Sequence, residues 1–295
     1  MSMIVKSCPL CEGEQNKLFD KRDFRGETVS NRICSTCGLV YQSPRMSEEE
    51  LADFYEGEYR SLYQGSQGPN PKDLAVQQSR ASSLLEFTRG KLSGCSRHLD
   101  IGCSAGLLMQ RFQEAYSCQS LGIEPGDAYR SYAQEQGQRV FASLAELETA
   151  NETQFDLISM AHVLEHIGDP VGYLTALREK WLVIGGHLLV EVPNLYAHDS
   201  FEIAHLVTFS HHTLSQTLQK AGFEIITLEE HGRPRSEVLP LYLTVLARSA
   251  ITPGTFHLQP EGGVMLKRRI GMFRRDLLTK LYPQRAWLPI KPPTD

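Results

Sequence analysis

The sequence predicts an α/β fold in which a mostly parallel sheet ends in an antiparallel strand pair. Between residues 91 and 250, short apolar runs alternate with segments of helical periodicity such as LLMQRFQEAY. The apolar runs are HLDIGC, SLGIEP, RVFAS, FDLISM and GHLLVEVP. Such alternation is typical of a parallel sheet with helices on both faces. Two further runs, FEIITLEE and LYLTVLAR, have no helix between them, which indicates an antiparallel pair at one edge.

The composition limits the kinds of partner that the chain is expected to have. Of its 295 residues 41% are hydrophobic, which is enough for one sizeable domain with smaller appendages. The formal net charge of −5 lacks the basic excess of a dedicated nucleic-acid binder. No apolar run is long enough to span a membrane. Seven cysteines without a secretion signal favour a cytoplasmic location.

The chain divides into four segments by composition. Residues 1–45 carry two CxxC pairs, and residues 46–90 are predicted to be a helical lid or linker. Within that linker, the Gly-, Pro- and Asn-rich stretch 63–73 is expected to be a mobile loop. Residues 91–250 form the alternating domain, and residues 251–295 form a basic tail.

The two N-terminal cysteine pairs predict a small zinc ribbon. Cys8 and Cys11 form the first pair, and Cys34 and Cys37 form the second after a gap of 22 residues. Four thiolates complete a tetrahedral zinc shell with no open position, so we expect the zinc to be structural. A ribbon of this size buries little apolar surface, and metal binding would stabilise its fold.

The glycine loop in HLDIGCSAG predicts a binding site after the first strand of the large domain. Ligands of such sheets bind beyond the carboxyl ends of the strands. The loop lacks the GxxxxGK[ST] pattern of a nucleoside triphosphate site and the GxGxxG pattern of a dinucleotide site. The remaining candidate carries no phosphate at this point. It is the amino-acid end of S-adenosylmethionine, held by bare backbone amides in a tight turn.

Glu124 ends the second strand of the domain, in SLGIEP. A carboxylate there is able to accept hydrogen bonds from both hydroxyls of a ribose. The alternative is a solvated charge at a strand end. Following the glycine loop, the ribose role is favoured.

These motifs resemble the class I S-adenosylmethionine-dependent methyltransferases over about residues 91–250. The matching motifs are LDIGCSAG, GIEP, FDLISMAHVLEHIGDP, GGHLLVEVPN and HLVTFSHHTLSQTLQKAGF. With CGLVYQSPRMSEEELADFYEGEY, the sequence is similar to a narrower group that carries a zinc ribbon before the methyltransferase domain. This resemblance implies an acceptor of the kinds on which members of that group often act, which are sugar nucleotides, polysaccharides and secondary metabolites.

The resemblance also implies which residues bind the cofactor. Asp100, Gly102 and Gly106 would line its methionine end, and Glu124 would hold its ribose. The remaining implied residues are Ser143 or Leu144 beside the adenine, and Met160 and Ala161 closing the pocket.

Methyl transfer to a hydroxyl requires a base, and His205 is the first candidate. It lies after the fifth strand, where the chain is expected to reach the acceptor, and a purely structural role is the alternative. The resembling sugar C-methyltransferases carry Tyr-x-Glu-His here. Glu202 and Ala204 replace the tyrosine and the glutamate in this chain, which favours O-methylation.

His166 is the second candidate for a catalytic role. With Glu165, in HVLEHIGDP, it resembles an acidic–histidine cluster that binds a divalent ion in quinone O-methyltransferases. The alternative is that this motif only starts a helix and shapes the pocket floor. His162 is a further candidate base, whereas His211 and His212 are interpreted as structural residues after the helix cap Ser210.

We therefore expect a methyltransferase that acts on a small molecule or glycan precursor, with O-methylation preferred. The alternatives are a sugar C-methyltransferase, an RNA methyltransferase and a non-catalytic cofactor-binding scaffold. The ribbon is only mildly basic, and MAHVLEH stands where base N-methyltransferases carry D/N-P-P-Y/F. Both features argue against RNA.

Two segments outside the alternating domain are expected to influence access to the site. Tyr55, Tyr59 and Tyr63 in the linker are candidates for a lid or for packing against the ribbon. The tail segment VMLKRRIGMFRRDLLTKLYPQRAW interleaves basic and apolar residues. It would either contact an anionic membrane surface or a phosphorylated acceptor, or pack on the domain as a helix.

Overall fold

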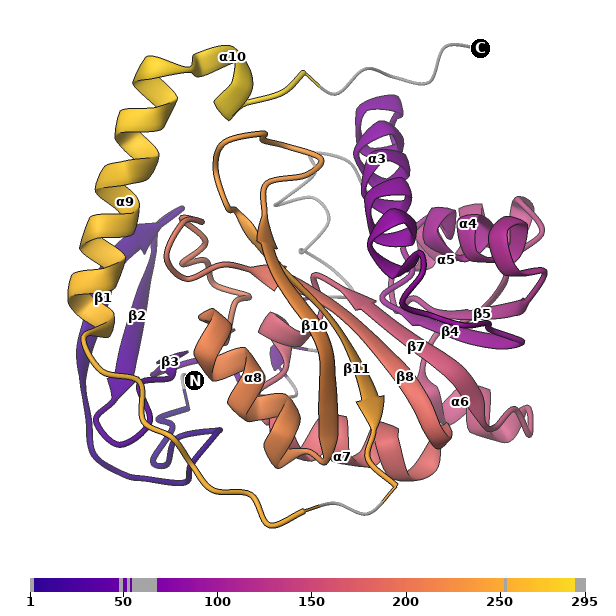
Figure 1. Ribbon diagram of the computed structural model, residues 1–295, viewed down its shortest axis with the longest axis horizontal. Coiled ribbons are helices and arrows are strands. Elements are labelled where there is room, and N and C mark those ends of the chain that lie inside the picture. The colour runs from indigo at the N-terminus through magenta and orange to yellow at the C-terminus, as the bar shows by residue number, and fades with distance from the viewer. Residues whose placement is uncertain (1–2, 48–49, 52–53, 55–67, 252–253, 290–295) are drawn as a thin grey trace.

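The structure is a computed structural model that describes residues 3–47, 50–51, 54, 68–251 and 254–289. Tyr55, Tyr59 and Tyr63, expected in a lid, lie outside the described residues. The described chain contains a seven-stranded sheet and a four-stranded sheet (Figure 1).

The large sheet confirms the predicted α/β class. Its strand order is β10-β11-β8-β7-β4-β5-β6. The pairings among β4 to β8 are parallel, whereas β11 pairs antiparallel with both β8 and β10 at one edge. The strands are β4 (Arg97–Ile101), β5 (Gln119–Ile123), β6 (Arg139–Phe141), β7 (Phe155–Ala161), β8 (Leu182–Pro193), β10 (Phe223–His231) and β11 (Tyr242–Ser249).

Helices cover both faces of the large sheet (Figure 1). One face carries α3 (Pro71–Thr88), α4 (Leu107–Tyr116) and α5 (Asp127–Glu135). The other carries α6 (Leu144–Thr149), α7 (Pro170–Lys180) and α8 (His211–Lys220). Alternate strand residues point to opposite faces. Leu157 of β7 therefore packs in the cluster under α3 and α4, whereas its neighbour Ile158 packs in the cluster under α7 and α8.

Local capping residues define where two of these helices begin. Ser210 accepts a hydrogen bond from the backbone of Thr213, which completes a capping box and confirms the predicted start of α8. The expected loop 63–73 extends too far, because α3 already begins at Pro71. Asn70 caps that helix by accepting from Asp73 N at 2.9 Å, and proline is favourable in a first helical turn.

The small sheet joins the N-terminal ribbon to the large domain. Its strands are β1 (Asn16–Phe24), β2 (Glu27–Cys34), β3 (Val40–Gln42) and β9 (Val207–Thr208), in the order β1-β2-β3-β9. Because β9 belongs to the loop region after β8, main-chain hydrogen bonds connect the ribbon to the domain. Leu10, Leu39 and Tyr41 of the ribbon are fully buried in the same apolar cluster as β7 and β8.

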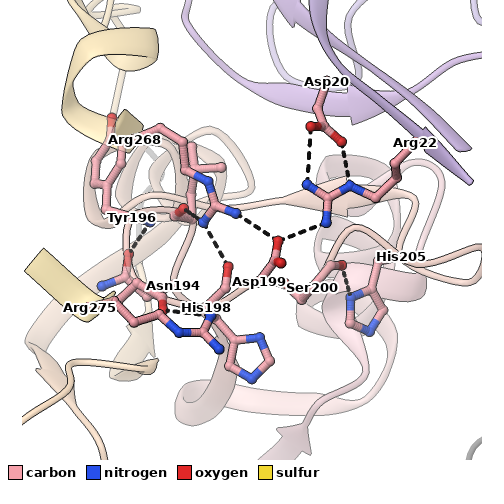
Figure 2. Close-up of polar contacts among 12 residues, drawn as sticks. Asp20, Arg22, Asn194, Tyr196, His198, Asp199, Ser200, His205, Arg268 and Arg275 are labelled. Carbon is pink, nitrogen blue, oxygen red and sulfur yellow. Dashed lines mark hydrogen bonds and ion pairs between the residues drawn. The ribbon is translucent and has the colours of Figure 1, made fainter. Parts of the chain in front are cut away.

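The C-terminal segment forms α9 (Val264–Leu281) and the short α10 (Pro283–Ala286). Helix α9 lies beside β1 and β2, away from α3 to α5 (Figure 1). Arg268 of α9 and Arg22 of β1 both donate to Asp199, at 3.1 and 2.8 Å (Figure 2). The loop between β8 and β9 is therefore held by the ribbon and the tail together. Among the described residues, no helix combines the length and apolarity needed to cross a membrane.

Candidate active site

A cavity of about 540 Å³ opens beyond the carboxyl ends of β4, β5, β6 and β7. The chain runs from β4 outward to β5 and β6, and then returns to β7 on the other side of β4. This reversal of strand order is where open α/β sheets bind ligands, because the loops diverge and leave a crevice. Helix α3 closes the cavity with Asp73, Val76, Gln77, Arg80, Ala81 and Leu84.

The glycine loop lies at the centre of this edge. Gly102 has φ +74, and a Cβ there would lie 2.5 Å from Val163 Cγ2, so both conformation and space require glycine. Gly106 also has a positive φ, +78, and precedes α4. Ser104 lines the cavity with a positive φ of 50, and its buried Oγ has no hydrogen-bond partner among the described residues.

The expectation of bare amides in this loop is wrong in part. Ser104 N donates to Glu124 Oε2 at 3.0 Å, and Ala105 N donates to Gln77 Oε1 at 3.2 Å. Gly102 N and Cys103 N both donate to the carbonyl of Ile123. The turn is therefore closed by the protein's own acceptors.

Glu124 lines the cavity, as expected for a ligand-binding residue. It is therefore not the solvated strand-end charge of the alternative interpretation. The residue is only 3% exposed. Its carboxylate also accepts from Gly126 N at 2.9 Å. A buried carboxylate tied to the loops after β4 and β5 has both a structural role and a position suited to ligand hydroxyls.

Asp100 also lines the cavity, at the end of β4, and it is 3% exposed. Its Oδ1 accepts from Ser159 Oγ at 2.6 Å. Burial, reinforced by the nearby Glu124 charge, raises the pKa of Asp100 to about 7. Ser159 Oγ also contacts His98 Nε2 at 2.7 Å, and burial lowers the pKa of His98 to about 3.

The other cofactor residues implied by the resemblance are only partly at the cavity. Ser143, Leu144 and Ala161 line it, and Ser143 also caps α6. Met160 does not line it, because its side chain packs in the core at 1% exposure. Gly106 does not line it either and serves as the left-handed start of α4.

Gln77 and Arg80 also line the cavity, although no sequence motif predicts a functional role for them. They lie on α3, which precedes the first strand of the domain. Arg80 Nε lies 2.9 Å from Glu191 Oε1 of β8. The spacing of Gln77 and Arg80 places them on one helix face, but nothing local in the sequence indicates that this face meets the cavity.

The second end of the cavity contains His162, which follows β7. It has a positive φ of 58, and its two ring nitrogens lie 3.2 Å from Glu165 Oε1 and 3.3 Å from Glu191 Oε1. Burial and the Arg80 charge oppose protonation, but these two carboxylates outweigh them and raise the pKa of His162. The two buried acids therefore favour the protonated form of His162.

His166 lines the same end of the cavity and ends the short helix η1 (Leu164–His166). Its Nδ1 donates to the carbonyl of Ala204 at 2.9 Å, since a carbonyl only accepts. The neutral ring therefore carries its lone pair on Nε2. Burial lowers the pKa of His166 to about 4, so the ring is neutral at pH 7.

His205 does not line the cavity but lies directly behind His166. The two ring centres are 4.9 Å apart. His205 Nδ1 donates to the carbonyl of Ser200 at 2.7 Å (Figure 2). Burial lowers the pKa of His205. One ligand atom from each of Glu165, His166 and His205 lies within 4.8 Å of the others. The structure thus brings the two predicted catalytic histidines together but aligns only His166 with the cavity.

The four ribbon cysteines also converge. Cys8, Cys11, Cys34 and Cys37 place their sulfur atoms within 4.8 Å of one another. The Cys8–Cys37 and Cys11–Cys34 sulfur pairs are each 3.5 Å apart. Four converging thiol groups are the donor set of a structural zinc site. They lie far along the chain from the cavity, but β3 connects them through β9 to the loop that carries His205.

Comparison with known proteins agrees with this arrangement. The family described as "Methyltransferase domain" matches residues 75–228, more than half of the chain. A ubiquinone biosynthesis O-methyltransferase of Vibrio cholerae is 29% identical over 145 residues, covering 47% of this chain and 54% of that protein. The same enzyme of Aeromonas salmonicida is 32% identical over 128 residues, covering 41% and 48%. The chain thus spans about half the length of these relatives.

Solved structures share the fold at low identity. The 1,6-didemethyltoxoflavin-N1-methyltransferase of Burkholderia thailandensis, solved with S-adenosylhomocysteine, has a TM-score of 0.56 and 17% identity. The alignment covers 78% of this chain and 99% of that one. The magnesium protoporphyrin IX methyltransferase of Synechocystis, also with S-adenosylhomocysteine, has a TM-score of 0.50 and 14% identity, covering 69% and 100%. The resemblance noted from the sequence is confirmed, and the chain belongs to the methyltransferase domain family, with the class I fold of S-adenosylmethionine-dependent methyltransferases.

Proposed function

We propose that the protein transfers a methyl group from S-adenosylmethionine to a hydroxyl of a small molecule, with a glycan precursor as the alternative acceptor. The observation that carries this proposal is that His166 lines the cavity while its Nδ1 donates to the carbonyl of Ala204, which fixes the tautomer of the neutral ring. A base in that position suits an acceptor that must lose a proton. The curated relatives are named as O-methyltransferases, which supports oxygen as the acceptor atom.

The cavity residues fit the cofactor. Glu124 offers a buried carboxylate for ribose hydroxyls, and Ser104, whose Oγ has no hydrogen-bond partner among the described residues, lines the same cavity. Ser143 and Leu144 would lie beside the adenine, and Asp100 and Gly102 would contact the methionine part. When bound, S-adenosylmethionine supplies an electrophilic methyl group on a good leaving group, so alignment and proton removal are the main tasks of the enzyme.

His166 would take the proton of the acceptor hydroxyl as its oxygen becomes nucleophilic. Two contacts would support that role. Ala204 fixes the tautomer, and His205 packs edge-on against the ring at 4.9 Å. His205 is thereby proposed as a positioning residue rather than as the base itself. Both ring nitrogens of His162 face carboxylates, those of Glu165 and Glu191, so neither nitrogen is directed toward an acceptor.

The proximity of Glu165, His166 and His205 also supports a second way of activating the hydroxyl. Their ligand atoms lie close enough to share a divalent cation, which would lower the pKa of a bound acceptor hydroxyl. Activity that survives prolonged treatment with EDTA would support the base. Activity lost with EDTA and restored by Mg²⁺ would support the cation.

The proposed reaction can be tested with matched acceptors. A catechol, a sugar nucleotide and their fully O-methylated counterparts would be incubated with S-adenosylmethionine, and S-adenosylhomocysteine and product would be measured by mass spectrometry. We expect turnover only with a free hydroxyl and a new methyl group on oxygen. Methyl transfer to carbon or nitrogen, or cofactor binding without turnover on any hydroxylated acceptor, would contradict the proposal.

We also propose that the ribbon binds one structural zinc ion through Cys8, Cys11, Cys34 and Cys37, because their thiol groups match its preferred donor set. Cys34→Ser should release the metal. Since Leu39 and Tyr41 belong to the main core cluster, the thermal midpoint of the whole protein should fall as well. Cys95→Ser, outside the cluster, should retain zinc. Elemental analysis that finds no zinc in wild-type protein purified without chelators would reject the site.

A further inference from the structure

Helix α9 exposes a continuous apolar stripe. The side chains of Leu266, Ile270, Phe273, Leu277 and Leu281 are between 44% and 70% exposed. At about 100° per residue, these five positions fall within an arc of about 80° on the helix surface. Exposed large apolar side chains are ordinary when scattered, but a continuous stripe indicates a binding surface.

The opposite face of α9 is anchored to the protein. Val264 and Arg268 are buried, and Arg268 donates to the carbonyl of His198 at 2.7 Å and to Asp199. A Cβ at Gly271 would lie 2.0 Å from the carbonyl oxygen of Tyr196, so the helix backbone approaches the loop closely. These contacts fix the rotation of the helix and direct the apolar stripe outward.

Basic residues border the stripe on both sides. On the helix surface, Lys267 and Arg274 follow one border, and Arg269 and Lys280 follow the other; all four are exposed. Lys267 pairs with Glu261, but Arg269, Arg274 and Lys280 have no acidic partner among the residues that the structure describes. The helix itself carries a single acid, Asp276.

The basic residues on both borders indicate which binding partner the apolar stripe fits. Two copies of α9 packed through the stripe would place like charges of both borders against each other, which is unfavourable. An anionic bilayer complements the surface: apolar side chains enter the acyl boundary while flanking cations reach the phosphates. Tyr282 and Trp287, 47% and 40% exposed, follow the stripe, and aromatic rings of this type favour the membrane interface.

We propose that α9 is a peripheral membrane-binding helix that lies on an anionic phospholipid surface through this stripe. The inference is independent of the proposed acceptor and of the catalytic role of His166. Because the helix is fixed to the loop between β8 and β9, binding would hold the enzyme at the bilayer in a defined orientation.

Vesicle co-sedimentation tests the proposal, with phosphatidylcholine alone or mixed with phosphatidylglycerol. Wild-type protein should bind the mixed vesicles and should not bind vesicles of pure phosphatidylcholine. Its binding to the mixed vesicles should weaken when salt is added. The variant F273S/L277S should lose binding. The variant R274Q/K280Q should bind roughly 25-fold more weakly, since each basic residue near an anionic surface contributes about a five-fold effect. I184S and K180Q/R248Q, which change exposed residues on the large domain, should bind like wild type.

Tryptophan fluorescence offers an independent readout. Trp181 is 3% exposed, so a blue shift on adding mixed vesicles would report on Trp287 beside α9. Equal binding to both kinds of vesicle, no binding, or full binding by F273S/L277S would overturn the proposal. A dimer in solution that F273S/L277S converts to a monomer would overturn it in favour of a second copy of the chain.

Discussion

The two ends of the cavity are assembled from different kinds of sequence information. At the proposed cofactor end, Asp100 lies at the end of β4, and Gly102 and Glu124 directly follow the consecutive strands β4 and β5. At the proposed acceptor end, the second end of the cavity with His162 and His166, His162 contacts Glu191 of β8, and Glu191 contacts Arg80 of α3. The first end is built from residues at the ends of successive strands, which short sequence motifs predict. The second end depends on which strands and helices become neighbours in the fold.

The two ends also differ in the main cause of their pKa shifts. Burial dominates at the cofactor end, raising the pKa of Asp100 and lowering that of His98. At the acceptor end, paired charges outweigh burial, so the pKa of His162 is raised and that of Glu165 is lowered to about 2. A buried group without a charged partner favours its neutral form, and a buried pair favours ionisation. We expect mutations at the two ends to separate binding from chemistry.

The largest expected effect is on the chemical step at the acceptor end. His166→Ala should lower kcat by roughly 10²- to 10⁴-fold, because it removes the proposed base that takes the proton of the acceptor hydroxyl. The affinity for S-adenosylmethionine should stay unchanged by calorimetry. His205→Ala should also lower kcat, but by less than His166→Ala, because it removes only the ring that packs against His166. A weaker effect of His166→Ala than of His205→Ala would reverse the assignment.

At the cofactor end, Glu124→Ala should weaken binding of S-adenosylmethionine by roughly 10- to 100-fold, because charge-assisted hydrogen bonds contribute about 1.5–3 kcal/mol each. The thermal midpoint should fall too, since the carboxylate holds Ser104 N and Gly126 N. Asp127→Ala, which removes an exposed acid nearby, is the control. If calorimetry gives wild-type affinity for Glu124→Ala, the ribose is bound elsewhere.

A smaller effect is expected from Gly102→Ala, which introduces a clash with Val163 and strain at a positive φ. Together these should lower stability by about 1–3 kcal/mol in denaturant unfolding. Adding Val163→Ala should restore the part due to the clash but not the part due to φ. Gly94→Ala, where nothing lies within 4 Å, is the control. Full recovery in the double variant would show that strain contributes nothing.

A further expected effect is on stability as a function of pH, and its sign should differ between His98 and His162. His98 has a folded pKa of about 3, below its unfolded value. Its contribution is therefore present above about pH 6.5 and declines as pH falls from there towards 3. The raised pKa of His162 gives the reverse: its contribution is present below about pH 6.5 and is lost as pH rises through the folded pKa. Histidine ring NMR should show His98 neutral and His162 charged at pH 6; the opposite pattern would contradict this contrast.

Several parts of the protein are predictable from short windows of sequence. Apolar periodicity predicts the strands and helices, and the run without an intervening helix predicts the antiparallel edge of β10 and β11. Paired cysteines predict a converging cluster, because each CxxC turn directs two sulfur atoms to one side. The cap at Ser210 and the left-handed turn at Gly102 are equally local.

Tertiary structure decided the rest. Nothing near Glu191 in the sequence indicates that it faces His162, since that contact follows from the pairing of β7 with β8. The place of His205 behind His166, rather than at the cavity, follows from the loop that β3 and α9 hold. Turns and periodicity depend on neighbours along the chain, and so the sequence alone determines them. The burial and charge of a side chain depend on which distant segments pack around it, and only the folded chain specifies those.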